Sequence, residues 1–114
     1  MILNDKDGLD VNIMIAVPTI YDILMEYYDK NNMQSRSNEI LHKCKDFRLM
    51  VSGSAALPEK SLLRWKEISG HTLLESFGMA EIGMALTNPY SEVNARHPGF
   101  VGHPFQGVKA AIHD

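Results

Sequence analysis

The sequence predicts an α/β fold with a parallel sheet, and two observations carry this prediction. Residues 12–17, 47–52 and 72–77 form runs with the length of strands, and the first, NIMIAV, is apolar on both faces. Amphipathic segments separate these runs, so the expected order is strand, helix, strand, helix, strand. Two consecutive crossover units of this kind give parallel strands with right-handed connections. Apolar strands also suit a sheet that is covered on both faces.

Composition and charge exclude several classes of protein. The chain has 114 residues and a net charge of −3 with neutral histidines, which argues against a nucleic-acid-binding face. The longest unbroken aliphatic run, residues 13–17, is far too short to span a membrane. Cys44 is the only cysteine, which excludes a disulfide framework and a multi-cysteine zinc site. We therefore expect neither a nucleic acid nor a membrane as a partner.

The first helix is expected over residues 19–32, after a strand that ends at Pro18. Thr19 is the expected N-cap, and Asn31 with Asn32 the expected end. Its apolar side chains recur at helical spacing near one face: Ile20, Leu24, Met25 and Tyr28. A polar loop over residues 34–38 and a short helix over residues 39–45 are expected to lead to the second strand.

A tight loop of small residues, 53–56, is expected to connect the second strand to the next helix. Pro58 suits the first turn of that helix, where its missing N–H costs nothing, and Gly70 suits the position just past its end. The third strand is expected to end at Gly78. Beyond it the sequence predicts one or two helical turns over residues 81–86, a loop over 88–103 and a last strand over 108–112.

This order of elements predicts where a ligand binds. In open parallel sheets, ligands bind outside the carboxyl ends of the strands. Residues 17–19, 52–56 and 77–81 leave the three strands at those ends, so all three should open onto one edge. Two of these loops are rich in glycine, serine and alanine, which let a ligand approach the backbone closely. The edge is therefore a plausible nucleotide or metal–phosphate site.

Several side chains at this edge have both a functional and a purely structural interpretation. Glu81 is either a capping carboxylate at a helix start or a magnesium ligand, and spacing alone favours the cap. Phe77 is either a core aromatic or a platform for a flat base. Glu75 is either a surface acid or a polar ligand contact. The glycine spacing of residues 78–83 matches a P-loop, but the lysine and the following hydroxyl residue are missing, so that interpretation is rejected.

Four segments in register resemble the adenylate-forming superfamily, which includes acyl-CoA synthetases, luciferases and peptide-synthetase adenylation domains. These segments are VPTIY at residues 17–21, VSGSAALP at 51–58, HTLLESFGMAEIGMAL at 71–86 and PGFVGHPFQGVKAAI at 98–112. The resemblance covers nearly the whole chain. The residues in these segments are most similar to those of the malonyl-CoA synthetase branch. That branch is often mitochondrial, so the resemblance also implies a mitochondrial location.

The resemblance implies a two-step reaction. ATP and a small carboxylic acid give an acyl-adenylate and pyrophosphate, and coenzyme A then displaces AMP to form a thioester. Positioning and charge neutralisation by Mg2+ matter most for the first step. Glu81 would be the catalytic residue because its carboxylate would hold Mg2+, and residues 17–21 would help to wall the acyl pocket. The implied contacts of the nucleotide and the acyl group are Gly53, Ser54 and Ala55 on the adenine side, Glu75, Ser76, Phe77 and Gly78 past the adenine, and Met79 toward the acyl region.

Two residues depart from the pattern of the superfamily. Ala80 stands where the family usually has threonine, whose hydroxyl contacts the α-phosphate. Losing such a transition-state hydrogen bond slows a reaction by orders of magnitude. Phe77 stands where the family usually has tyrosine, a milder change that keeps the ring.

The resemblance also implies that residues 1–114 are one partial AMP-binding domain. The upstream phosphate loop with its lysine and the small C-terminal domain have no counterpart here, so the chain alone is expected to be inactive, to expose apolar surface and to associate. Two alternatives stay open. One is a truncated or degenerated, non-catalytic product that acts as a binding module. The other is a different acid–thiol ligase branch, such as an aryl- or medium-chain-acid ligase.

Overall fold

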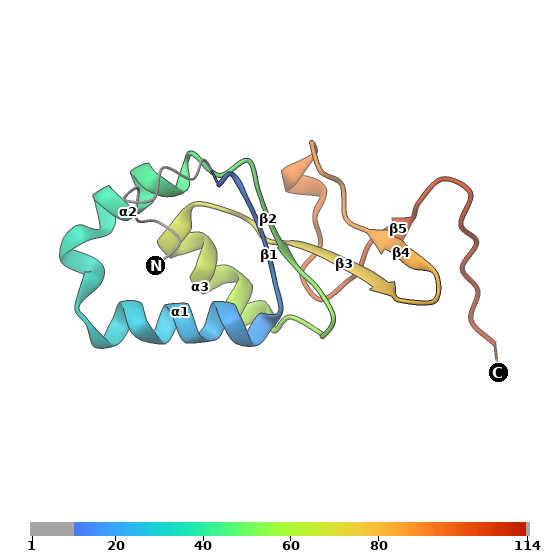
Figure 1. Cartoon of the computed structure of the whole chain (residues 1–114), viewed down its shortest axis with the longest axis horizontal. Coiled ribbons are helices and arrows are strands. Elements are labelled where there is room, and N and C mark those ends of the chain that lie inside the picture. The colour runs from blue at the N-terminus through green and yellow to red at the C-terminus, as the bar shows by residue number, and fades with distance from the viewer. Residues whose placement is uncertain (1–10, 114) are drawn as a thin grey trace.

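The computed structural model, which describes residues 11–113, is a five-stranded sheet with helices on one face (Figure 1). The strands lie in the order β1-β2-β3-β4-β5. Their bounds are β1 Ile13–Ala16, β2 Leu49–Ser52, β3 Leu74–Met79, β4 Gly83–Thr87 and β5 His103–Pro104. The helices are α1 Pro18–Lys30, α2 Ser37–Cys44 and α3 Glu59–Ser69, with short 3-10 turns η2 Met33–Arg36 and η3 Val93–Ala95.

The three predicted strands form the parallel half of the sheet, as expected. Ile13 of β1 lies opposite Leu49 of β2, and Val51 of β2 lies opposite Leu74 of β3. Because the strands follow one another in one direction, right-handed crossovers place all connecting helices on the same face. The expectation that helices cover both faces is therefore not met within residues 11–113.

The second half of the sheet is antiparallel and was not predicted. Residues 81–86 do not form helical turns, because β4 pairs antiparallel with β3 from Gly83 onward. Gly78 does not end β3 but lies within it, where a Cβ atom would come within 2.7 Å of Met84 Sδ. The close approach of β4 thus requires glycine at this position. Sequence periodicity did not reveal this hairpin.

The predicted last strand, residues 108–112, is also wrong. Residues 106–113 have no strand partner, and Ile112 is 99% exposed. The edge of β4 is instead occupied by β5, which begins at His103, the last residue of the segment predicted as loop. An apolar run becomes a strand only where a free sheet edge is within reach, and β5 has taken that edge.

The helix ends differ from prediction in detail. Helix α1 begins at Pro18 with Val17 as its N-cap and no side-chain cap, so Thr19 is not the cap. The expected loop over residues 34–38 is instead the turn η2 followed by the start of α2. Gly70 ends α3 in the left-handed conformation with φ 77°, as predicted. No helix among the described residues is long and apolar enough to cross a membrane.

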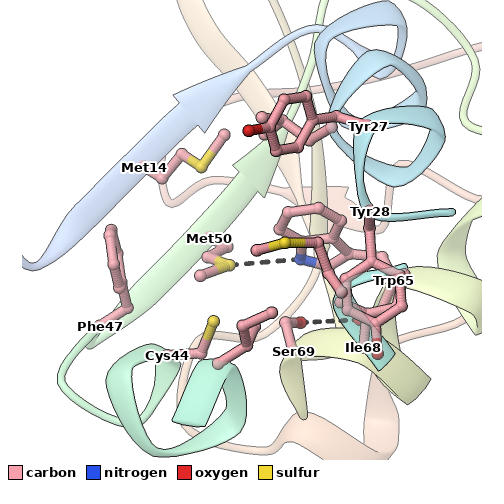
Figure 2. Close-up of a pocket in the computed structure, with 12 residues that line it drawn as sticks. Met14, Tyr27, Tyr28, Cys44, Phe47, Met50, Trp65, Ile68 and Ser69 are labelled. Atoms are coloured by element: carbon pink, nitrogen blue, oxygen red, sulfur yellow. Dashed lines mark hydrogen bonds between the residues drawn. The ribbon is translucent and has the colours of Figure 1, made fainter. Parts of the chain in front are cut away.

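The core lies between the helices and one face of the sheet (Figure 2). Its side chains surround an apolar cavity of about 60 Å3, where Trp65 donates its ring N–H to Met50 Sδ over 3.3 Å. Cys44 also lines this cavity and is 3% exposed. Burial raises the pKa of the Cys44 thiol. Cys44 is therefore a packing residue of the core.

Candidate functional site

The carboxyl ends of the three parallel strands meet at one cleft of about 440 Å3, as the strand order predicts. Every strand from β1 to β4 contributes to its wall. The lining residues are Ile15, Ala16, Val17, Val51, Gly53, Ser54, Ser76, Gly78, Met79, Gly83 and Met84. Five of the predicted site residues are therefore brought together: Gly53, Ser54, Ser76, Gly78 and Met79.

The loop after β2 enters the cleft with a constrained backbone. The Gly53 N–H donates to the Ala16 carbonyl over 3.2 Å, which ties the loop to the end of β1. Ser54 follows with φ 68°, a left-handed conformation that is uncommon for a residue with a side chain. Residues held in this way concentrate at ligand sites. Ala55 is exposed and lies outside the cleft wall.

Ser76 brings an unpaired hydroxyl to the cleft. Its side chain is 7% exposed, and among the described residues its Oγ has no hydrogen-bond partner. Ser52 Oγ, in the neighbouring strand, is also buried and has no hydrogen-bond partner among these residues. Buried polar atoms are almost always hydrogen-bonded, so an unpaired one demands an explanation. For Ser76, a ligand atom or a water in the cleft would supply the missing partner.

Glu75 lies next to Ser76 but is absent from the cleft wall. It is 6% exposed, and its Oε2 accepts the Gly99 N–H over 3.1 Å. The backbone N–H of Leu57 donates to the same carboxylate. Burial raises the pKa of Glu75, and the two backbone donors oppose that rise. Glu75 is therefore not a surface acid, which was one of its two interpretations.

The turn between β3 and β4 carries two more predicted site residues, and Phe77 lies within β3. Ala80 and Glu81 are exposed in a hairpin turn that the Ile82 N–H closes onto the Met79 carbonyl over 3.2 Å. Glu81 cannot cap a helix, because no helix starts there, so the interpretation that spacing favoured is wrong. Phe77 is 40% exposed and does not line the cleft.

The possible metal ligands around Glu81 show whether it can bind Mg2+. Among residues 11–113, no group of three or more histidine, cysteine or acidic side chains could hold a metal ion. A fully protein-built metal cage is therefore absent from this part of the chain. Mg2+ commonly binds through one or two carboxylates and keeps its waters and phosphate ligands. A single exposed carboxylate such as Glu81 fits that mode of binding.

Apolar residues line much of the cleft, and the sequence predicted only some of them. Val17 lines the cleft, as expected for the acyl wall, whereas Pro18 and Tyr21 are buried in the core. Sequence reasoning missed Ile15, Ala16, Val51, Gly83 and Met84. The alternation of β1 and β2 could have identified Ile15 and its register partner Val51, but the residues from β4 depend on the unpredicted hairpin.

Within residues 11–113, no basic side chain lines the cleft. Arg48 precedes β2 and lines a separate cavity at the amino end of the sheet. Arg96 lines that cavity too, and its guanidinium donates to the carbonyls of Pro89, Thr72 and Tyr90. Lys109 lies in the exposed segment after β5. None of the three basic residues considered for an acidic acyl group is therefore at this site.

Comparisons with known proteins identify the family. The family described as "AMP-binding enzyme" matches residues 2–114. The mitochondrial malonate–CoA ligase of Bos taurus is 54% identical over 109 residues, and the match covers 94% of this chain. The malonate–CoA ligase of Arabidopsis thaliana is 37% identical over 109 residues and covers 96% of the chain. The chain spans only 18% and 17% of the lengths of these two relatives.

A solved structure supports the same relationship. ATP-bound MatB from Rhodopseudomonas palustris superimposes with a TM-score of 0.70 at 31% identity. The match covers 93% of this chain and 18% of that structure.

Proposed function

Because the chain belongs to the AMP-binding enzyme family, we propose that it is part of an acyl-CoA synthetase that activates malonate or a similar short acid. The acid and ATP give an acyl-adenylate, and coenzyme A then takes the acyl group as a thioester. The chain spans about 18% of the length of its relatives, so we regard residues 1–114 as one partial domain that is inactive by itself.

The observation that carries the proposal is the cleft at the carboxyl ends of β1, β2 and β3. Its polar groups are the Gly53–Ser54 backbone and the unpaired Ser76 hydroxyl. The exposed apolar side chains of Ile15, Met79 and Met84 line the same cleft. A cleft that combines polar and apolar lining suits an acyl-adenylate, which joins a nucleotide to a carbon chain.

On this proposal the nucleotide lies along the loop after β2 and along β3. Gly53 and Ser54 offer backbone groups to it, Ser76 offers its hydroxyl, and Gly78 permits close approach. Ala55 and Phe77 would contact the adenine from outside the cleft wall. Glu81, in the exposed hairpin turn beside Ala80, would hold Mg2+ together with the phosphates. When bound, Mg2+ neutralises phosphate charge.

The malonate assignment rests on the names of the relatives. Two relatives are named as malonate–CoA ligases, and one solved relative, 29% identical, is a malonyl-CoA ligase complex with methylmalonyl-CoA and AMP. Malonate has a second carboxylate that needs a positive partner. Since none of the described residues brings a basic side chain to the cleft, we propose that this partner comes from another part of the enzyme. A mitochondrial location is proposed from the animal relatives.

Ala80 supports a second candidate function. Without the hydroxyl that the family carries at this position, a protein that binds nucleotide but activates acids poorly is also consistent with the sequence. Such a protein would be a binding module. Nucleotide binding is common to both candidates, and acid activation separates them.

Titration of the 15N-labelled chain with AMP tests the nucleotide site. We expect the amides of Gly53, Ser54, Ser76 and Gly78 to shift, and Ser76→Ala to weaken binding roughly three- to tenfold. Ser69→Ala is the control, because Ser69 is also buried but its hydroxyl bonds to the Trp65 carbonyl and the His71 N–H, away from the cleft. AMP-induced shifts confined to other parts of the chain, or none at saturating AMP, would refute the proposed site.

A further inference from the structure

Glu75 connects two loops to the strand that borders the cleft. Its side chain lies outside the cleft wall, and its direct neighbour Ser76 lies within it. The carboxylate accepts one backbone N–H from Leu57 and one from Gly99. Among the described residues it has no basic side chain as partner. A buried carboxylate that bonds only to backbone donors organises the chain around it.

The bond to Leu57 fixes the far end of the candidate nucleotide loop. That loop begins at Gly53, which is tied to the Ala16 carbonyl, and it ends at Leu57, which is 2% exposed. Between these anchors Ser54 has φ 68°. A strained residue keeps its conformation only where the structure on both sides over-determines it. Glu75 supplies the polar part of the second anchor.

The bond to Gly99 is reinforced by a neighbouring buried amide. Asn88, 2% exposed, donates to the carbonyls of Glu75 and Phe100 and accepts the N–H of His97. Glu75 and Asn88 thus hold residues 97–100 against β3 from two sides. Satisfied buried polar groups of this kind specify a single arrangement of the backbone.

We propose that Glu75 is a positioning residue that holds the Gly53–Leu57 loop, and with it the backbone of Ser54, in the conformation that receives the nucleotide. This inference rests on the proposed function for its consequence but not for its geometry. Glu75 acts through Leu57 and Gly99 and does not itself contact the nucleotide. Its carboxylate replaces the solvent that these two backbone donors lose on burial.

Two substitutions and one control test the role of Glu75 in the 114-residue chain. Glu75→Gln keeps the shape and one good acceptor, whereas Glu75→Ala removes both. Glu67→Gln is the control, because Glu67 is an exposed carboxylate paired with Arg64 on α3. The readouts are the three-bond coupling that reports φ of Ser54, the exchange rates of the Leu57 and Gly99 amides, and the affinity for AMP.

We expect Glu75→Ala to change the Ser54 coupling, to speed exchange at both amides and to weaken AMP binding roughly tenfold or more. Glu75→Gln should show intermediate changes, and Glu67→Gln none. If Glu75→Ala does not fold, the Glu75→Gln measurements decide. An unchanged Ser54 coupling in the folded variant overturns the proposal. Failure of the parent chain to bind AMP would refute the proposed function, while the coupling and exchange data still decide the positioning role.

Discussion

The hydroxyl of Tyr21 donates a hydrogen bond to the carbonyl of Val51 over 2.7 Å. Tyr21 is fully buried in α1, and Val51 lies in β2, two residues before Gly53. The Tyr21 ring also meets Trp65 of α3 edge to face, with centroids 4.9 Å apart. One side chain therefore joins two helices to the strand that leads into the candidate site.

Replacing Tyr21 with phenylalanine should destabilise the chain by about 1–3 kcal/mol, because the ring stays while a buried bond to Val51 is lost. Tyr27→Phe is the matched control. Tyr27 is 48% exposed on the same helix, so its variant should stay within about 0.5 kcal/mol of the parent. Urea denaturation followed by circular dichroism measures both changes. Equal effects of the two substitutions would contradict the importance of the Tyr21–Val51 bond.

Gly102 should tolerate no side chain. It has φ 87°, and a Cβ atom there would overlap the Thr87 carbonyl, where β5 pairs with β4. Gly107 has φ 88° with nothing nearby, so Gly107→Ala carries only the backbone penalty of about 1–2 kcal/mol. Gly102→Ala should cost more and release β5. Faster amide exchange at Phe105, which donates to the Ala85 carbonyl, would report that release in Gly102→Ala alone.

Because of Glu75, the free energy of unfolding should fall as the pH rises from the ordinary glutamate pKa through the raised pKa of Glu75 in the folded state. Burial raises the pKa of Glu75 in the folded state, so folding favours the protonated form. Its stabilising contribution is complete below the unfolded pKa and is lost as the pH climbs through the raised value. The free energy of unfolding, measured across this range, should decline less in Glu75→Gln. The difference between parent and variant separates Glu75 from the other carboxylates, and a constant difference would contradict the prediction.

The uncovered face of the sheet should cause the chain to self-associate. Ile15, on the edge strand β1, is 71% exposed, and it shares the cleft wall with Met79 and Met84. Ile15→Lys places a charge on this edge and should weaken association roughly tenfold. This is about the change in affinity expected when one large aliphatic side chain is no longer buried at the contact. Sedimentation velocity over a concentration series measures this effect. A parent chain that stays monomeric throughout would contradict the prediction.

The parallel half of the fold was predictable because its signals are local. Residues 12–17 and 47–52 are apolar runs, and Pro18 and Gly70 mark helix ends by their own backbone chemistry. The antiparallel half was not predictable, because the hairpin at Ala80–Glu81 depends on contacts between Gly78 and Met84. The edge that holds the site followed from strand order. The orientation of Glu75 away from the cleft depends on Leu57 and Gly99, which no local pattern indicates.

Ala80 provides a test of the catalytic assignment. If the native protein activates acids, Ala80→Thr should restore the α-phosphate contact that the family carries and raise the adenylation rate, by up to about 100-fold for one transition-state hydrogen bond. Ala80→Ser offers the same hydroxyl with less bulk, and Ala110→Ser is a control in the exposed segment after β5, outside the candidate site. Rates of adenylate formation in single-turnover assays check this prediction. No gain in either Ala80 variant would argue against a phosphate contact at this position.

The most direct measurement is malonate-dependent exchange of pyrophosphate into ATP, because this exchange reports the formation of the acyl-adenylate itself. It should be made on the native protein purified from its source by an antibody to this sequence, with the isolated 114-residue chain alongside. We expect exchange in the native protein, dependent on malonate or a similar short acid, and none in the isolated chain. Absence of exchange in the native protein with malonate and with a panel of other carboxylic acids would contradict the assignment to an acid-activating enzyme.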